Sequence, residues 1–137
     1  MDKVWNAACA CGQMSVRLRG APKLVSSCCC EACQRRGGAF VSVTVFFDDD
    51  QVLERHGETR TWRRTGESGN VIDFSFCPTC GSTVWWRAQA RPGTVLVAGG
   101  CMTDPELPGP ERLIWTDYRH PSVRMAENVR EYPRGPN

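Results

Sequence analysis

Two short cysteine pairs are the residues of this chain with the clearest chemical potential. They are Cys9-Ala10-Cys11-Gly12 and Cys77-Pro78-Thr79-Cys80-Gly81, with 65 residues between Cys11 and Cys77. Thiolates one or two residues apart can share one metal ion, and a glycine directly after the second cysteine accepts the backbone angles of a tight turn. The two pairs together predict a four-thiolate tetrahedron, the closed geometry of structural zinc.

We interpret this set, Cys9, Cys11, Cys77 and Cys80, as purely structural. Zinc binding by small cysteine-containing peptides is worth about 10 to 16 kcal/mol, while a typical domain has a net stability of about 5 to 15 kcal/mol. We therefore expect the loss of any one of these thiolates to unfold the chain rather than only to inactivate it.

A third cluster, Cys28-Cys29-Cys30-Glu31-Ala32-Cys33, has too few partners for a second closed site. In an extended segment Cys28 and Cys30 project to one side and Cys29 to the other, and a turn at Glu31-Ala32 would let Cys33 join the first two. This arrangement predicts three thiolates with an open fourth position, the layout of a working zinc site. Two alternatives remain open: a redox pair formed by Cys30 and Cys33, and buried thiols that act as small hydrophobic residues, above all Cys29.

Charge counting indicates the chemistry of such a three-thiolate site. Zinc with three thiolates carries a charge of −1, so it polarises carbonyl groups weakly. It is better suited to taking a substrate thiol as its fourth ligand and holding that thiol deprotonated, because the thiolate is the competent nucleophile at neutral pH. We therefore expect a thiol substrate and a reaction that makes or breaks a carbon–sulfur bond.

Other polar residues carry weaker signals. Arg35 and Arg36 follow the three-cysteine cluster and are either carboxylate-binding groups or a solvated basic turn. We interpret Cys101 as a buried thiol, and His56 and His120 as surface histidines.

The composition limits the possible classes of protein. The chain has 137 residues, which suits one domain over 1–137, and a net charge of +2, too small to indicate a nucleic-acid partner. No stretch has the apolar length of a signal peptide or of a membrane span, so we expect a cytoplasmic protein without membrane association. Nine cysteines, an odd number in a reducing compartment, favour metal binding over disulfides.

The elements that must position these cysteines are mostly β. Alternating or β-branched patterns predict strands over residues 13–19, 39–47, 59–64, 71–76, 83–87 and 94–98, while residues 24–27 lead into the three-cysteine cluster. A short helical turn is predicted over 31–36, ended by Gly37-Gly38, and a short apolar run over 113–115. The tail from about residue 125 is expected to be loosely attached.

The order of the motifs resembles that of a known family. Cys9 to Gly12, Cys28 to Gly37, Ser68 to Asn70 and Phe76 to Thr83 are similar to the motifs of the glutathione-dependent formaldehyde-activating enzymes, which include centromere protein V-like proteins. Weaker similarity continues through Gly99 to Pro105. The chain departs from the family pattern at Cys29, where a histidine is common.

The resemblance implies an Mss4-like fold of several coiled β-sheets, a structural zinc at Cys9, Cys11, Cys77 and Cys80, and a second, catalytic zinc at Cys28, Cys30 and Cys33. It also implies a carbon–sulfur lyase that joins a glutathione-type thiol reversibly to formaldehyde or another small aldehyde. The alternative is a non-catalytic zinc-binding module for a protein or small-thiol partner, because fold alone does not fix function.

Overall fold

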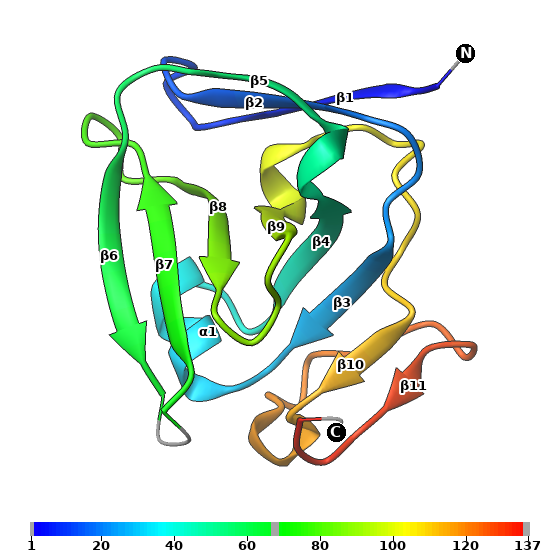
Figure 1. The fold of residues 1–137 in the computed structure, drawn as a ribbon. Helices are drawn as coiled ribbons and strands as arrows, with labels where there is room; N and C mark the ends of the chain where they lie inside the picture. Colours follow the sequence, from blue (N-terminus) through cyan, green and yellow to red (C-terminus); the bar gives the residue numbers. More distant parts are fainter. Residues whose placement is uncertain (1, 67–68, 136–137) are drawn as a thin grey trace.

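The protein is mostly β, with more than one sheet, as the sequence predicts. The computed structural model describes residues 2–66 and 69–135, in which three strands form a small sheet in the order β1-β2-β5 and eight form a larger one in the order β11-β10-β3-β4-β9-β8-β7-β6 (Figure 1). The strands are β1 Val4–Ala8, β2 Ser15–Arg19, β3 Leu24–Cys28, β4 Ser42–Asp48, β5 Val52–His56, β6 Arg60–Thr65, β7 Val71–Phe76, β8 Thr83–Ala88, β9 Thr94–Ala98, β10 Arg112–Ile114 and β11 Arg130–Glu131. The helical elements are α1 Glu31–Gly37 and the 3₁₀ turns η1 Asp49–Gln51, η2 Gly99–Cys101 and η3 Thr116–Tyr118.

The main core lies between the small sheet and the centre of the large one. In β2 every second residue is fully buried, as the predicted alternation requires, and these side chains join one cluster with Val45, Phe47, Val95 and Val97 of β4 and β9. Phe46 and Leu96 belong to a second cluster with Phe74 and Trp86. Because side chains alternate along a strand, β4 and β9 serve both clusters, one on each face of the large sheet.

Helix α1 is short and has no fully buried residue. Its Arg36 side chain packs on the second hydrophobic cluster, with the guanidinium carbon 4.6 Å from the ring centre of Phe74 and 4.5 Å from that of Trp86. Gln34 adds side-chain hydrogen bonds to the carbonyl oxygens of Cys29, at 2.8 Å, and Tyr118, at 3.1 Å. These contacts position the helix that carries Cys33.

The sequence indicates β3 and β10 only as a segment leading into the cysteine cluster and a short apolar run, and it does not predict strands β1, β5 and β11. Alanine and asparagine make up most of β1, and β5 (Val-Leu-Glu-Arg-His) contains charged residues and is largely exposed. Neither strand therefore carries the alternation of β-branched residues that is typical of a strand. Strand β11 has only two residues and pairs in parallel with β10. All three strands are recognised by their backbone partners rather than by their composition.

Residues 130–134 differ from the loosely attached tail expected from about residue 125. They run beside residues 112–117, where the backbone N–H groups of Trp115, Thr116 and Asp117 donate to the carbonyl oxygens of Arg134, Tyr132 and Pro133 at 3.3, 3.0 and 3.2 Å. The physical reason is main-chain pairing with little side-chain burial, which leaves no hydrophobic signal in the sequence.

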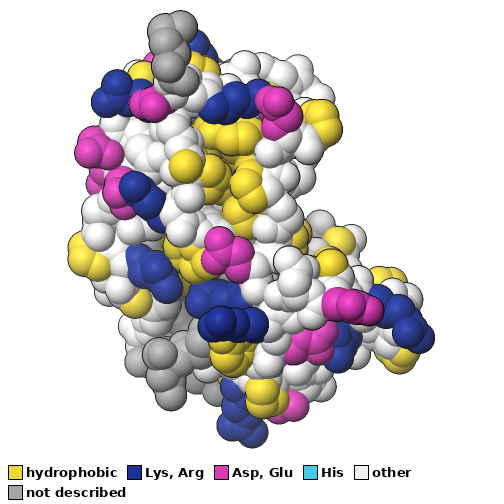
Figure 2. All heavy atoms as spheres, turned by 90° about the vertical axis from the view of Figure 1, so that its right-hand side faces the viewer, with side chains coloured by type: hydrophobic (Ala, Val, Ile, Leu, Met, Phe, Trp, Pro, Cys, Tyr) yellow, Lys and Arg dark blue, Asp and Glu magenta, His cyan; other side chains and the backbone are white. Residues whose placement is uncertain are grey.

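The outer surface mixes the two signs of charge. On the face that Figure 2 shows, Lys and Arg side chains are interspersed with Asp and Glu around a run of hydrophobic side chains. Within residues 2–66 and 69–135, no helix has the length and apolar character needed to cross a membrane.

Candidate metal centres

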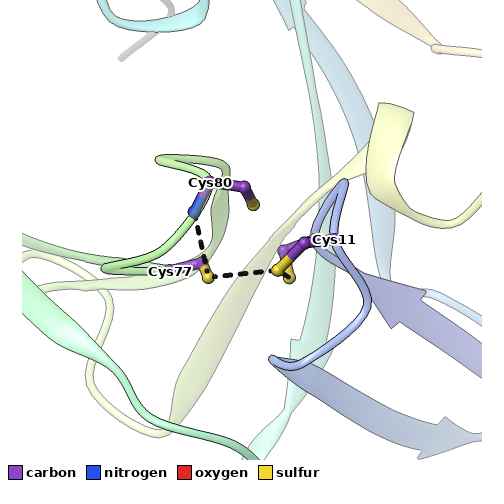
Figure 3. A group of neighbouring side chains, drawn as sticks. Cys11, Cys77 and Cys80 are labelled. Carbon is purple, nitrogen blue, oxygen red and sulfur yellow. Dashed lines mark hydrogen bonds between the residues drawn. The ribbon is translucent and has the colours of Figure 1, made fainter.

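The four cysteines of the two separated pairs come together at the loops between β1 and β2 and between β7 and β8. The sulfur atoms of Cys9, Cys11, Cys77 and Cys80 all lie within 4.8 Å of one another. Cys9 and Cys77 are buried, and Cys11 and Cys80 are exposed at the rim. Figure 3 shows Cys77 and Cys80 of one loop facing Cys11 of the other, with 3.7 Å between the sulfur atoms of Cys11 and Cys77. This cluster joins both sheets.

Both loops close as tight turns at the expected glycines. Gly12 has a φ of 85° and its N–H donates to the carbonyl oxygen of Cys9, while Gly81 has a φ of 81° and donates to that of Cys77. A positive φ disfavours residues with a Cβ, so glycine lets the chain reverse directly after each second cysteine.

Hydrogen-bond donors surround the sulfur atoms of this cluster. Cys77 Sγ accepts from Gln13 Nε2 at 3.0 Å and from two backbone N–H groups of its own turn. Burial opposes a charged Cys77, but these donors lower the pKa of its thiol overall. The Ser82 hydroxyl lies 3.3 Å from Cys80 Sγ, and its hydrogen bond, together with backbone hydrogen bonds from Ser82 and Cys11, lowers the pKa of Cys80 to about 5. Cys77 and Cys80 therefore favour the thiolate, the form that binds metal. At Cys11 the backbone hydrogen bond from Gln13 is outweighed by desolvation and by the neighbouring thiols, which raise its pKa to about 11.

The second cluster forms where β3 passes into α1. Cys28 ends β3, Cys30 is the N-cap of α1 and Cys33 lies in its first turn, and their three sulfur atoms are within 4.8 Å of one another. The N–H of Cys33 donates to Cys30 Sγ at 3.3 Å, which is the side-chain cap of the helix. Cys29 points away and is fully buried, as the predicted alternation requires.

The pKa values of the thiols in this cluster are shifted in opposite directions. Hydrogen bonds from the side chains of Cys28 and Cys33 lower the pKa of Cys30, and the same contact with Cys30 raises the pKa of Cys28. Arg64 adds a smaller favourable charge to Cys30. Cys30, the cysteine whose pKa is lowered, is also the member of the cluster that lines a cavity.

That cavity has a volume of about 740 Å³ and is built by three segments at the lower end of the molecule in Figure 1. The start of α1, the β6–β7 hairpin and the C-terminal segment contribute, in that order, Cys30, Glu31, Ala32, Arg64, Gly66, Asn70, Trp115, Tyr118 and Arg134. The side-chain oxygen of Asn70 is buried and has no hydrogen-bond partner among the described residues. Ser68 of the Ser-Gly-Asn motif lies outside the described residues.

Several residues weighed in the sequence lie elsewhere. Arg35 is exposed and pairs with Glu31 at 3.4 Å, Arg36 is held by the aromatic rings, and neither lines the cavity. His56 pairs with Glu54, and His120 stacks on Phe40 with 3.9 Å between ring centres. Cys101 is half-buried, with its thiol 3.6 Å from the carbonyl oxygen of Thr83.

Sequence reasoning missed Gln13 and the cavity residues Arg64, Trp115, Tyr118 and Arg134. Gln13 was visible only as the first residue of a predicted strand, and its amide reaches Cys77 because the same side chain is fixed to the backbone of Glu58. The cavity residues come from segments far apart in the chain, so no local spacing connects them.

The donor sets fit metal ions of the zinc type. Thiolate sulfur is a preferred zinc ligand, four thiolates complete a tetrahedron, and three leave one position open. The four-cysteine cluster therefore suits a closed site. The three-cysteine cluster suits an open one, because Cys30 borders the cavity.

Comparisons with known proteins agree with this arrangement. The solved structure of a Rhodobacter sphaeroides protein is similar, with 17% sequence identity, a TM-score of 0.53, and coverage of 73% of this chain and 91% of that chain. No curated protein matches the chain in sequence. Residues 4–118, which contain both cysteine clusters, match the model of the glutathione-dependent formaldehyde-activating enzymes. The chain therefore belongs to the glutathione-dependent formaldehyde-activating enzyme family.

Proposed function

We propose that the protein is a zinc-dependent carbon–sulfur lyase that joins a glutathione-type thiol reversibly to a small aldehyde. The observation that carries the proposal is the cluster of Cys28, Cys30 and Cys33, whose sulfur atoms lie within 4.8 Å of one another at the wall of a cavity. Family membership supports the thiol and the aldehyde as substrates. The four-cysteine cluster is proposed to hold the structural zinc.

In this proposal Cys28, Cys30 and Cys33 would hold one zinc ion beside the cavity that Cys30 lines. The chemistry that zinc supplies there is to lower the pKa of a bound substrate thiol, so that the sulfur is nucleophilic at neutral pH. In the net reaction the substrate sulfur forms a bond to the aldehyde carbon, and the proton of the thiol ends on the aldehyde oxygen. The reverse reaction breaks the same carbon–sulfur bond.

The surrounding residues hold and shield the substrates. The half-buried positions of all three cysteines limit the access of water to the sulfur atoms. Trp115 and Tyr118, whose ring centres are 6.1 Å apart, contribute aromatic side chains to the lining of the cavity. Excluding water strengthens electrostatic interactions with a thiolate.

The test is formaldehyde–glutathione exchange measured by NMR with protein shown to hold two zinc ions. The adduct also forms without enzyme, so only acceleration above that background counts. We expect acceleration in the wild type and in the matched control Cys101→Ser, which lies outside both clusters, and none in Cys30→Ser. Cys30→Ser should remain folded by circular dichroism.

Two outcomes would contradict the lyase proposal. Protein with two zinc ions and no acceleration would instead support the zinc-binding module. A fully active Cys30→Ser variant would show that the three-cysteine site does not carry the reaction.

A further inference from the structure

The cavity beside Cys30 carries arginines on two of its three walls. Arg64 is half-buried on β6, and no carboxylate of the described residues lies within ion-pair distance of its guanidinium group. Arg134 approaches from the C-terminal segment. The acidic residue of the lining, Glu31, is paired with Arg35 outside the cavity. Arg64 and Arg134 therefore bring two guanidinium groups to the described lining of the cavity, beside the carboxylate of Glu31.

The position of Arg134 is set by the backbone of the C-terminal segment. Three hydrogen bonds tie residues 132–134 to Trp115, Thr116 and Asp117, and Trp115 itself has a positive φ of 61°, which is uncommon for a residue with a Cβ. Asp117 Oδ2 lies 3.6 Å from Arg134 Nε, too far for a hydrogen bond, so this pair orients the guanidinium group without occupying its donors.

Arg134 also lies beyond residues 4–118, the part of the chain that matches the family. Its contribution to the cavity is therefore a property of this chain that family membership does not supply. Guanidinium groups bind carboxylates through two parallel hydrogen bonds, and the Arg134 side chain, which is 77% exposed, is accessible for such a contact.

We propose that Arg64 and Arg134 bind carboxylates of the thiol substrate and make this pocket selective for thiols that carry more than one negative charge. The inference deepens the proposed function and rests on it for the cavity as the thiol site. The two arginines act as specificity-determining residues, and the C-terminal segment 130–134 becomes part of the binding site.

The first test compares two ligands on the same zinc-loaded wild-type protein, by calorimetry. The probes are glutathione, which has two free carboxylates, and its dimethyl ester, in which both are masked. We expect the ester to bind about tenfold more weakly, since each lost ion pair is worth up to about 1 kcal/mol or a factor of about five. In about 1 M salt, where the screening length falls to about 3 Å, the difference should shrink.

The second test assigns the effect to residues. Arg64→Gln and Arg134→Gln should each weaken glutathione binding about fivefold and leave the binding of the ester unchanged. Arg60→Gln, on the same strand, and Arg124→Gln, in the same C-terminal part of the chain, are matched controls because neither residue lines the cavity. Both controls should bind glutathione like the wild type.

The proposal is overturned if the wild type binds glutathione and its ester equally well, if it binds neither, or if the control variants lose as much affinity as the pocket variants. The ligand comparison needs no variant, so a misfolded variant does not weaken the test. Failure of the lyase proposal appears separately, as binding discrimination without acceleration of formaldehyde exchange.

Discussion

Gln13 donates a hydrogen bond from Nε2 to Sγ of Cys77 across 3.0 Å. The same amide nitrogen donates to the carbonyl oxygen of Glu58, and its oxygen accepts from the N–H of that residue, both at 2.8 Å. The Gln13 side chain thus connects its own loop to the loop of Cys77 and to the backbone at Glu58. Outer hydrogen bonds of this kind orient a ligand and stabilise its charged form.

Replacing Gln13 by Leu should therefore weaken zinc binding at the four-cysteine site by about 10- to 100-fold, since groups that hydrogen-bond to a metal ligand typically contribute that much to metal affinity. Competition with a chromophoric chelator would measure the change. Gln89→Leu is the matched control, because Gln89 is exposed. Unchanged affinity in Gln13→Leu would show that its hydrogen bond to Cys77 is dispensable.

Loss of one ligand of the four-cysteine set should unfold the protein. We expect Cys77→Ser to lack a cooperative thermal transition by circular dichroism, and wild-type protein treated with a strong chelator to behave in the same way, because metal binding is comparable with the whole stability of a domain. Cys101→Ser, with its half-buried thiol outside the clusters, should melt close to the wild type. A well-folded Cys77→Ser protein would argue against a structural metal.

Ser82 should control the acid stability of the same site. Its hydroxyl and the backbone N–H groups of Ser82 and Cys11 together lower the pKa of Cys80 to about 5, so fewer protons compete with metal for this sulfur as the pH falls. Ser82→Ala removes the hydroxyl donor and raises the pKa of Cys80, and zinc should then be released at a higher pH during acidification. An indicator dye would follow the release. Thr79→Ala, in the same turn, keeps its backbone donor to Cys77 and should release zinc as the wild type does.

Arg36 should contribute to stability through its aromatic contacts rather than through its charge alone. Arg36→Ala removes the contacts with Phe74 and Trp86 and should lower the free energy of unfolding by about 1 to 2 kcal/mol. Arg35→Ala, at the neighbouring exposed position, should change it by less than about 0.5 kcal/mol. Urea denaturation would compare the two variants, and equal effects would exclude a special role for the aromatic pair.

The sequence allowed the two cysteine clusters to be predicted because their geometry is mostly local. A pair of thiols with a following glycine specifies its own turn, and the Cys28–Cys33 segment needs only the change from strand to helix. The central strands were also predictable, because Val95 and Val97 alternate with residues that face the other side.

The cavity could not be predicted in this way. Arg64 lies on β6, at one edge of the large sheet, while Trp115 and Arg134 lie near β10 and the other edge. The two edges nevertheless contribute to the same cavity, a relationship that follows only from the three-dimensional fold. Backbone pairing of β11 and of residues 132–134 leaves no pattern of apolar residues, so the element that completes the cavity had no signature in the sequence.

The two clusters also differ in when a growing chain can make them. Cys28, Cys30 and Cys33 lie within six consecutive residues, so their thiols can meet as soon as that segment has been synthesised. The contact between Cys11 and Cys77 instead closes a long loop, which carries a larger entropic cost and must wait for β7. The three-cysteine cluster is therefore the first of the two sets to be complete in a nascent chain, and the four-cysteine cluster is completed only by a later, long-range folding event.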